Sequence, residues 1–185
     1  MTYSPYYLFF PDLILGHTRS VVIRNDPNKV PDGDYVFVEV FCTDKKCDCR
    51  RAMINVEQMD PAFPLFRAAT ISYGWEPRFF YKNWSPSMSQ KMLDEFKGPC
   101  LDSHQPQSKY APFFLDFFKQ MIAIDTAYHN RLKKHYAQFK WSQGMKIPIQ
   151  MQFDPLALCP CKSGAKFKFC CGKTARHIFE ANKLK

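Results

Sequence analysis

No part of this 185-residue chain offers the run of about 20 apolar residues that a membrane-spanning helix requires. The apolar stretch 3–15 contains Pro5, Pro11 and Asp12, and it lacks the basic start and small-residue cleavage site of a secretory signal. The chain also has no nucleophile elbow, P-loop, dinucleotide-binding glycine motif or His-Glu-x-x-His sequence. These absences argue against membrane-spanning, secreted and several enzyme classes, and they predict a cytoplasmic protein with reduced thiols.

The composition indicates one folded domain, with at most a small appendage. Phenylalanine (18) and tyrosine (9) are frequent and spread along the whole chain, which favours a packed aromatic core over a stacking surface. The formal net charge of +9 is compatible with nucleic acid, acidic proteins or anionic lipid as a partner.

Segments rich in β-branched and aromatic residues predict strands at 35–41, 51–57 and 66–73, with a further short strand at 21–23. The first two of the longer segments would form a hairpin whose connection carries three cysteines. We therefore expect a small antiparallel sheet of three or four strands.

Helical patterns occupy much of the rest of the main domain. Ser85-Pro86 is a good helix start, and Gly98-Pro99 a good end. From residue 108 to 140, apolar residues recur at spacings of three and four, either as one helix or as two with a break near Asp125–Thr126. These patterns predict an α+β fold in which the sheet packs on two or three helices.

The most informative stretch lies near the end of the chain, where four cysteines fall within thirteen residues. They are Cys159, Cys161, Cys170 and Cys171. Four thiolates can close one tetrahedral zinc site of the structural kind. The alternatives are a disulfide cluster or free thiols.

This stretch, C-P-C-K-S-G-A-K-F-K-F-C-C, resembles the SEC-C motif, a small zinc module at the end of the bacterial preprotein-translocase ATPase and of many other bacterial proteins. Lys162 stands where the motif usually has glycine. The resemblance implies that the four tail cysteines bind zinc and that the tail docks a protein or ribosomal partner. Gly144, which breaks the last helical pattern, and the prolines Pro148 and Pro155 predict a linker at 145–158 between an α+β domain (1–144) and the zinc knuckle with its tail (159–185).

A second group of cysteines, Cys42, Cys47 and Cys49, falls in the connection of the predicted hairpin. Three sulfurs there could share a metal ion with a more distant fourth ligand, for which Cys100 and His104 are the candidates. A closed site would be structural, whereas an open fourth position would bind water and make catalysis conceivable. The sequence Cys-Asp-Cys-Arg-Arg at this point also resembles that of uncharacterised bacterial proteins ending in SEC-C.

Two other interpretations of this second group remain open. In one, the three thiols are free and Cys100 is a small core residue. In the other, Arg50 and Arg51 lower the pKa of the thiols at Cys47 and Cys49, giving a redox function.

The tail from residue 159 onward has Glu180 as its one acidic residue among seven basic ones. The basic residues are Lys162, Lys166, Lys168, Lys173, Arg176, Lys183 and Lys185. Such a tail suits phosphate contact, so nucleic-acid binding is the alternative to a protein-docking adaptor. Another basic group, Arg131, Lys133, Lys134 and Lys140, is predicted to be a solvated helix face, and the histidines appear isolated. A metal enzyme or thiol redox protein is the hypothesis with least support.

Overall fold

The computed structural model describes most of the main domain and a few residues of the tail. The described residues are 2–27, 30–59, 66–144, 156, 164–166 and 169–170. Of the four tail cysteines, only Cys170 is among them. The predicted zinc knuckle and most of the predicted linker therefore lie outside the described residues.

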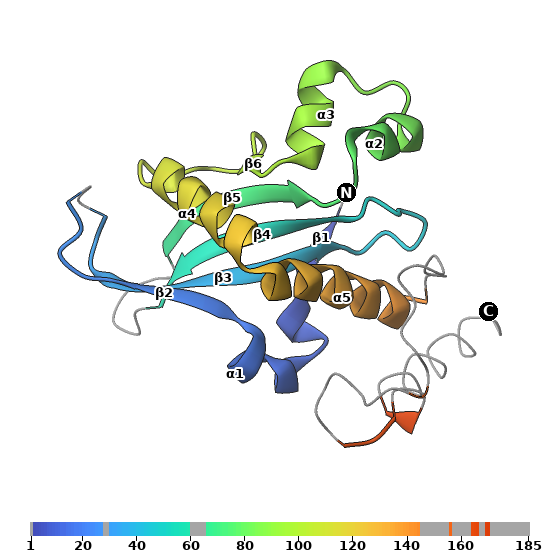
Figure 1. Cartoon of the computed structure of the whole chain (residues 1–185), viewed down its shortest axis with the longest axis horizontal. Coiled ribbons are helices and arrows are strands. Elements are labelled where there is room, and N and C mark those ends of the chain that lie inside the picture. The colour runs from blue at the N-terminus through green and yellow to red at the C-terminus, as the bar shows by residue number, and fades with distance from the viewer. Residues whose placement is uncertain are drawn as a thin grey trace.

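An antiparallel sheet of six strands forms the centre of the fold (Figure 1). The strands are β1 (Tyr3–Pro5), β2 (Arg19–Ile23), β3 (Gly33–Cys42), β4 (Arg51–Gln58), β5 (Phe66–Gly74) and β6 (Cys100–Leu101). Their order is β1-β3-β4-β5-β6. Strands β1 and β2 share the same edge of β3: β1 pairs with residues 40–42 and β2 with residues 33–37. Between β1 and β2 the chain leaves this edge through the short helices η1 (Tyr6–Leu8), η2 (Pro11–Leu13) and α1 (Ile14–His17).

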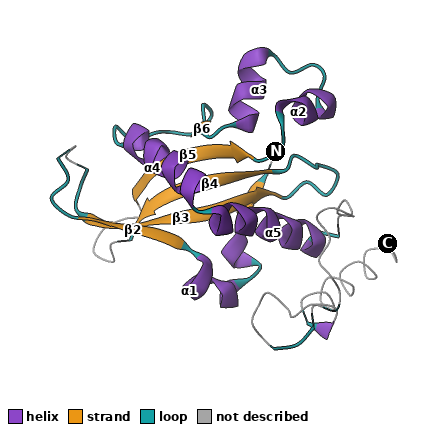
Figure 2. Cartoon of the chain, in the orientation of Figure 1, coloured by secondary structure: helices purple, strands orange, loops and turns teal. Residues whose placement is uncertain are grey.

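One face of the sheet is covered by two long helices, α4 (Ala111–Ile124) and α5 (Thr126–Ser142) (Figure 2). Phe37 of β3 stacks near Phe118 of α4, and Phe41 contacts Tyr136 and Phe139 of α5. This aromatic layer is the main core and confirms the predicted α+β class. Among the described residues, no helix has both the length and the apolar character needed to cross a bilayer.

The structure places the break in the long helical region at Asp125. The Asp125 carboxylate accepts a hydrogen bond from the Tyr128 amide at 2.8 Å, which caps the start of α5. It also forms an ion pair with Arg19 of β2. The predicted alternative of two helices is therefore the correct one. The ion pair of Asp125 with Arg19 connects the turn between the helices to the sheet.

Two further helices, α2 (Arg78–Trp84) and α3 (Gln90–Lys97), lie beside β5 (Figure 1). The predicted helix start at Ser85 is wrong, because the Ser85 amide bonds to the Tyr81 carbonyl and ends α2. Helix α3 begins after Ser89, whose hydroxyl accepts a hydrogen bond from the Met92 amide. The prediction of three or four strands is too low, because the sequence patterns missed β1 and β6, and strands of two or three residues carry no periodicity.

Candidate metal centre

The three cysteines of the main domain come from one hairpin. Cys42 is the last residue of β3, and Cys47 and Cys49 lie in the loop before β4 begins. A turn closed by the Cys47 amide and the Asp44 carbonyl folds the loop back, and the Asp44 carboxylate caps it by accepting from the Lys46 amide. These local hydrogen bonds reverse the chain direction between Cys42 and Cys47.

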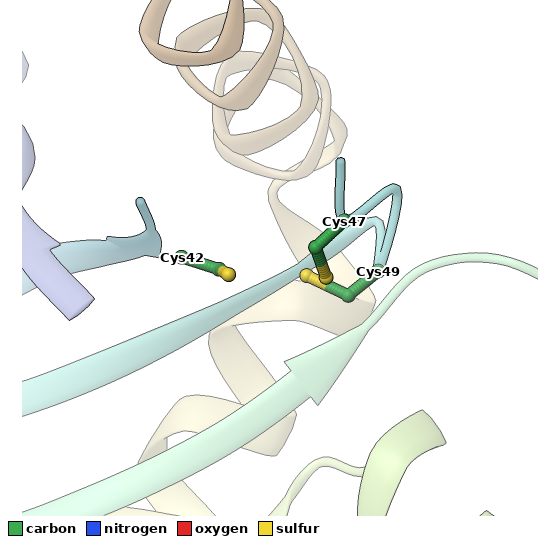
Figure 3. Close-up of side chains that lie close together, drawn as sticks. All are labelled: Cys42, Cys47 and Cys49. Atoms are coloured by element: carbon green, nitrogen blue, oxygen red, sulfur yellow. The ribbon is translucent and has the colours of Figure 1, made fainter. Parts of the chain in front are cut away.

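The sulfur atoms of Cys42, Cys47 and Cys49 all lie within 4.8 Å of one another (Figure 3). A tetrahedral zinc site with Zn–S bonds of about 2.3 Å sets its sulfurs roughly 3.8 Å apart, so a small contraction would suffice. The three residues are 0–6% exposed, and none of them forms a disulfide. The sequence spacing therefore predicted correctly that Cys42, Cys47 and Cys49 lie together, and the structure shows that all three are buried.

The cluster favours one thiolate even without a metal. Hydrogen bonds from Cys47 and Cys49, with further help from the Asp44 amide and the Lys140 charge, lower the pKa of Cys42 to about 2. The same bonds to Cys42, together with burial, raise the pKa of Cys47 and of Cys49. The expectation that Arg50 and Arg51 would lower the pKa at Cys47 and Cys49 is therefore wrong, since the Arg50 guanidinium pairs with carboxylates instead.

Lys140 is the residue at this site that the sequence patterns misplaced. It was expected on a solvated face of α5, but its side chain is fully buried and its ammonium donates to the Asp44 carbonyl at 3.0 Å. Among the described residues, no carboxylate pairs with it. A buried ammonium is costly without a negative partner, and the charge of Lys140 contributes to the lowered pKa of the Cys42 thiol.

The loop is held in place from several sides. The Tyr136 hydroxyl of α5 accepts from the Arg50 amide and donates to the Asp48 carboxylate. The Arg50 guanidinium forms ion pairs with Asp48 at 3.0 Å and with Glu76 at 3.1 Å. These contacts connect the cysteine loop to α5 and to Glu76, so the loop is held by its neighbours as well as by its own turn.

Cys100, the proposed fourth ligand, lies elsewhere. Strand register runs from Val40 to Met53 to Ser72 to Cys100, so β4 and β5 separate Cys100 from β3. At about 4.8 Å per strand, this is a separation on the order of 14 Å. The Cys100 thiol donates to the Glu95 carbonyl at 3.4 Å instead.

His104, the other proposed fourth ligand, is also placed away from the three cysteines. Its side chain is 83% exposed and groups with Glu95 and Asp102. Neither candidate is brought to the cluster, so within the described residues the group that could hold a metal ion consists of three cysteines.

Sequence patterns also missed a hydrogen-bonded group formed by His135, Glu39 and His17. The His135 imidazole of α5 is hydrogen-bonded to the Glu39 carboxylate at 2.6 Å and to the His17 ring at 3.0 Å. The Tyr6 ring stacks on His135. The expectation of isolated histidines is wrong here, because the three partners come from separate segments that only the fold brings together.

Comparison with known proteins gives no relative: no family model, no curated protein and no solved structure matches the chain. The SEC-C resemblance of the tail therefore stays a prediction. The buried cysteine cluster is the feature on which a functional proposal can stand.

Proposed function

We propose that this protein is a zinc-binding interaction protein. Cys42, Cys47 and Cys49 would hold a structural zinc ion, and the SEC-C-like tail would dock a protein or ribosomal partner. The observation that carries the metal site is the convergence of three buried thiols beside Lys140, a buried cation without a carboxylate partner in the described residues.

Charge supports an anionic centre at this position. Three thiolates and one Zn²⁺ together carry a single negative charge, which the Lys140 ammonium would neutralise. Thiolate ligands favour zinc, copper(I) and iron–sulfur clusters, and zinc suits a site built to hold shape without redox change.

Burial favours a structural site over a catalytic one. A catalytic zinc keeps an open position that water and substrate reach, whereas the three sulfurs here come from residues that are 0–6% exposed. The centre would fasten the β3–β4 hairpin to α5, through the loop carbonyl that Lys140 binds. Helix α5 ends at Ser142, and the chain then enters the segment that the sequence predicts as a linker to the tail.

Zinc content of purified variants tests the metal assignment. We expect Cys42→Ser to lose the zinc of the main domain and Cys170→Ser to lose only the zinc of the tail. The double variant should bind none. Cys100→Ser is the matched control, and it should keep the zinc content of the wild type because Cys100 lies outside the cluster. Unchanged zinc in Cys42→Ser would contradict the main-domain site.

Capture from native lysate, with and without nuclease, tests the docking role of the tail. Protein or ribosomal partners that bind wild type and not Cys170→Ser, and that survive nuclease, would support docking. Capture that nuclease abolishes and that weakens steeply with salt would favour the nucleic-acid alternative. Capture that Cys170→Ser leaves unchanged would contradict a docking tail.

A further inference from the structure

A cavity of about 330 Å³ lies beside the edge of β3 that β1 and β2 share. Val38 and Glu39 of β3 lie between the stretches that pair with these two strands, and both line the cavity. Residues of the segment that connects β1 to β2 supply much of the remaining lining. The volume is at the lower end of the range for small-molecule sites. Neither a cysteine nor Lys140 lines this cavity, so it is separate from the candidate metal centre.

The lining is largely aromatic and aliphatic. The Tyr6 ring stacks on Phe10 at 4.7 Å between ring centres and on His135 at 4.2 Å. Leu13 and Val38 add aliphatic surface to the same cavity. Such a surface can bind the apolar part of a ligand through the hydrophobic effect, and a small number of polar groups then fix the orientation of that ligand.

Glu39 is the unusual residue of this lining, because its side chain is only 7% exposed. Its Oε2 atom is hydrogen-bonded to the His135 imidazole at 2.6 Å, whereas no donor of the described residues reaches Oε1. Oε1 is also not among the fully enclosed polar atoms that lack a partner, so it keeps accessible surface. Buried polar atoms are normally hydrogen-bonded. One oxygen of Glu39 is therefore open to a donor that enters the cavity.

The charged residues of the lining favour a cation as that donor. Among the described residues that line the cavity, none is a lysine or an arginine, so an anionic ligand would find no fixed positive charge there. The other carboxyl group of the lining, Glu57, already forms an ion pair with Arg67 at 3.2 Å. Glu39 is therefore the carboxyl group with which a ligand can pair. An ammonium group offers three donors, and its hydrogen bond to a carboxylate is stronger than that of a neutral donor.

We propose that this cavity binds a small monoamine with an apolar body. The ammonium group would donate a hydrogen bond to Oε1 of Glu39. The apolar body would lie against Phe10, Leu13 and Val38, which supply apolar parts of the lining.

The direct test titrates the full-length protein with phenethylamine at neutral pH and follows the methyl signals of Leu13 and Val38 in ¹H–¹³C NMR spectra. We expect saturable shifts of both signals. The methyl signals of Leu93, which belongs to the separate apolar cluster around α2 and α3, should not move. The neutral isostere, phenethyl alcohol, should bind roughly 10- to 100-fold more weakly, because it cannot pair with the charge of Glu39. Hydrocinnamate, which carries a carboxylate in place of the amine, should bind more weakly than the alcohol.

Glu39→Gln separates charge pairing from the shape of the cavity. Glutamine keeps the size of the side chain and can still hydrogen-bond to His135, but it removes the negative charge. The variant should therefore bind the amine and the alcohol about equally. Glu57→Gln is the matched control, because it makes the same change at a lining residue that pairs with Arg67, and it should keep the wild-type preference for the amine. If Glu39→Gln fails to fold, the comparison of amine, alcohol and carboxylate on the wild type still decides.

Three results would overturn the proposal. The first is equal affinity of the wild type for the amine and the alcohol. The second is a preference for the amine that persists in Glu39→Gln or that disappears in Glu57→Gln. The third is the absence of any shift of the Leu13 and Val38 methyl signals at about 10 mM amine, since binding weaker than that is too weak for a built site.

Discussion

Replacement of Lys140 by methionine tests whether the cysteine cluster is an anionic centre. The variant keeps most of the side-chain volume and removes the buried charge. Without that cation, the thiolate at Cys42, or the zinc–thiolate centre, becomes an uncompensated buried anion. Breaking a buried ion pair from one side costs about 3–5 kcal/mol, so we expect a loss of that order in the free energy of unfolding.

A double-mutant cycle isolates the interaction itself. In a Cys42→Ser background the principal thiolate is gone, so Lys140→Met should cost far less there, or even stabilise the protein by removing an unpaired buried cation. Coupled neighbouring groups show interaction energies of about 0.5–3 kcal/mol, and we expect the upper end of that range for this pair.

Urea denaturation of the metal-free protein, followed by circular dichroism, measures each corner of this cycle. Lys134→Met is the matched control, because it makes the same change at an exposed position of the same helix, where the expected change is within about 0.5 kcal/mol. Additive effects of Lys140→Met and Cys42→Ser would refute the claim that the buried ammonium neutralises the cysteine cluster.

Three other predictions follow from the described residues. Zinc binding should release about two protons at neutral pH, because the pKa of Cys42 is lowered and those of Cys47 and Cys49 are raised. The affinity for zinc should therefore fall as the pH falls. Calorimetry in buffers of different ionisation enthalpy measures the number of protons released. His135→Ala should cost about 1–3 kcal/mol in denaturant unfolding because it leaves the buried Glu39 side chain without its hydrogen-bond partner, whereas His104→Ala, at an exposed ring, should be nearly neutral. Asp125→Ala should lower the free energy of unfolding in the same assay through loss of the α5 cap, and no measurable loss would contradict that role.

The parts of the fold that sequence predicted well are those governed by local rules. The strand at 35–41 was visible because it is almost wholly β-branched and aromatic, and it appears within β3. The three-cysteine loop was visible because its cysteines are close in sequence. A break near Asp125 was one of two alternatives that the sequence left open, and the structure decides for it because the Asp125 side chain caps α5.

The parts that sequence could not predict depend on which strands and helices become neighbours. Cys100 seemed a plausible fourth ligand only because strand order was unknown, and two intervening strands now separate it from Cys42. His135 and Lys140 looked like polar positions of a helix, and their partners come from segments about a hundred residues away. Burial of such polar groups follows from tertiary packing, which helical periodicity does not encode.

Zinc K-edge X-ray absorption on the Cys170→Ser variant of the full chain tests the central claim most directly, because the zinc predicted for the tail should then be absent. The account predicts bound zinc with at least three sulfur ligands at about 2.3 Å, supplied by Cys42, Cys47 and Cys49. A variant that purifies without zinc and takes up none, or a first shell made of oxygen and nitrogen alone, would contradict it.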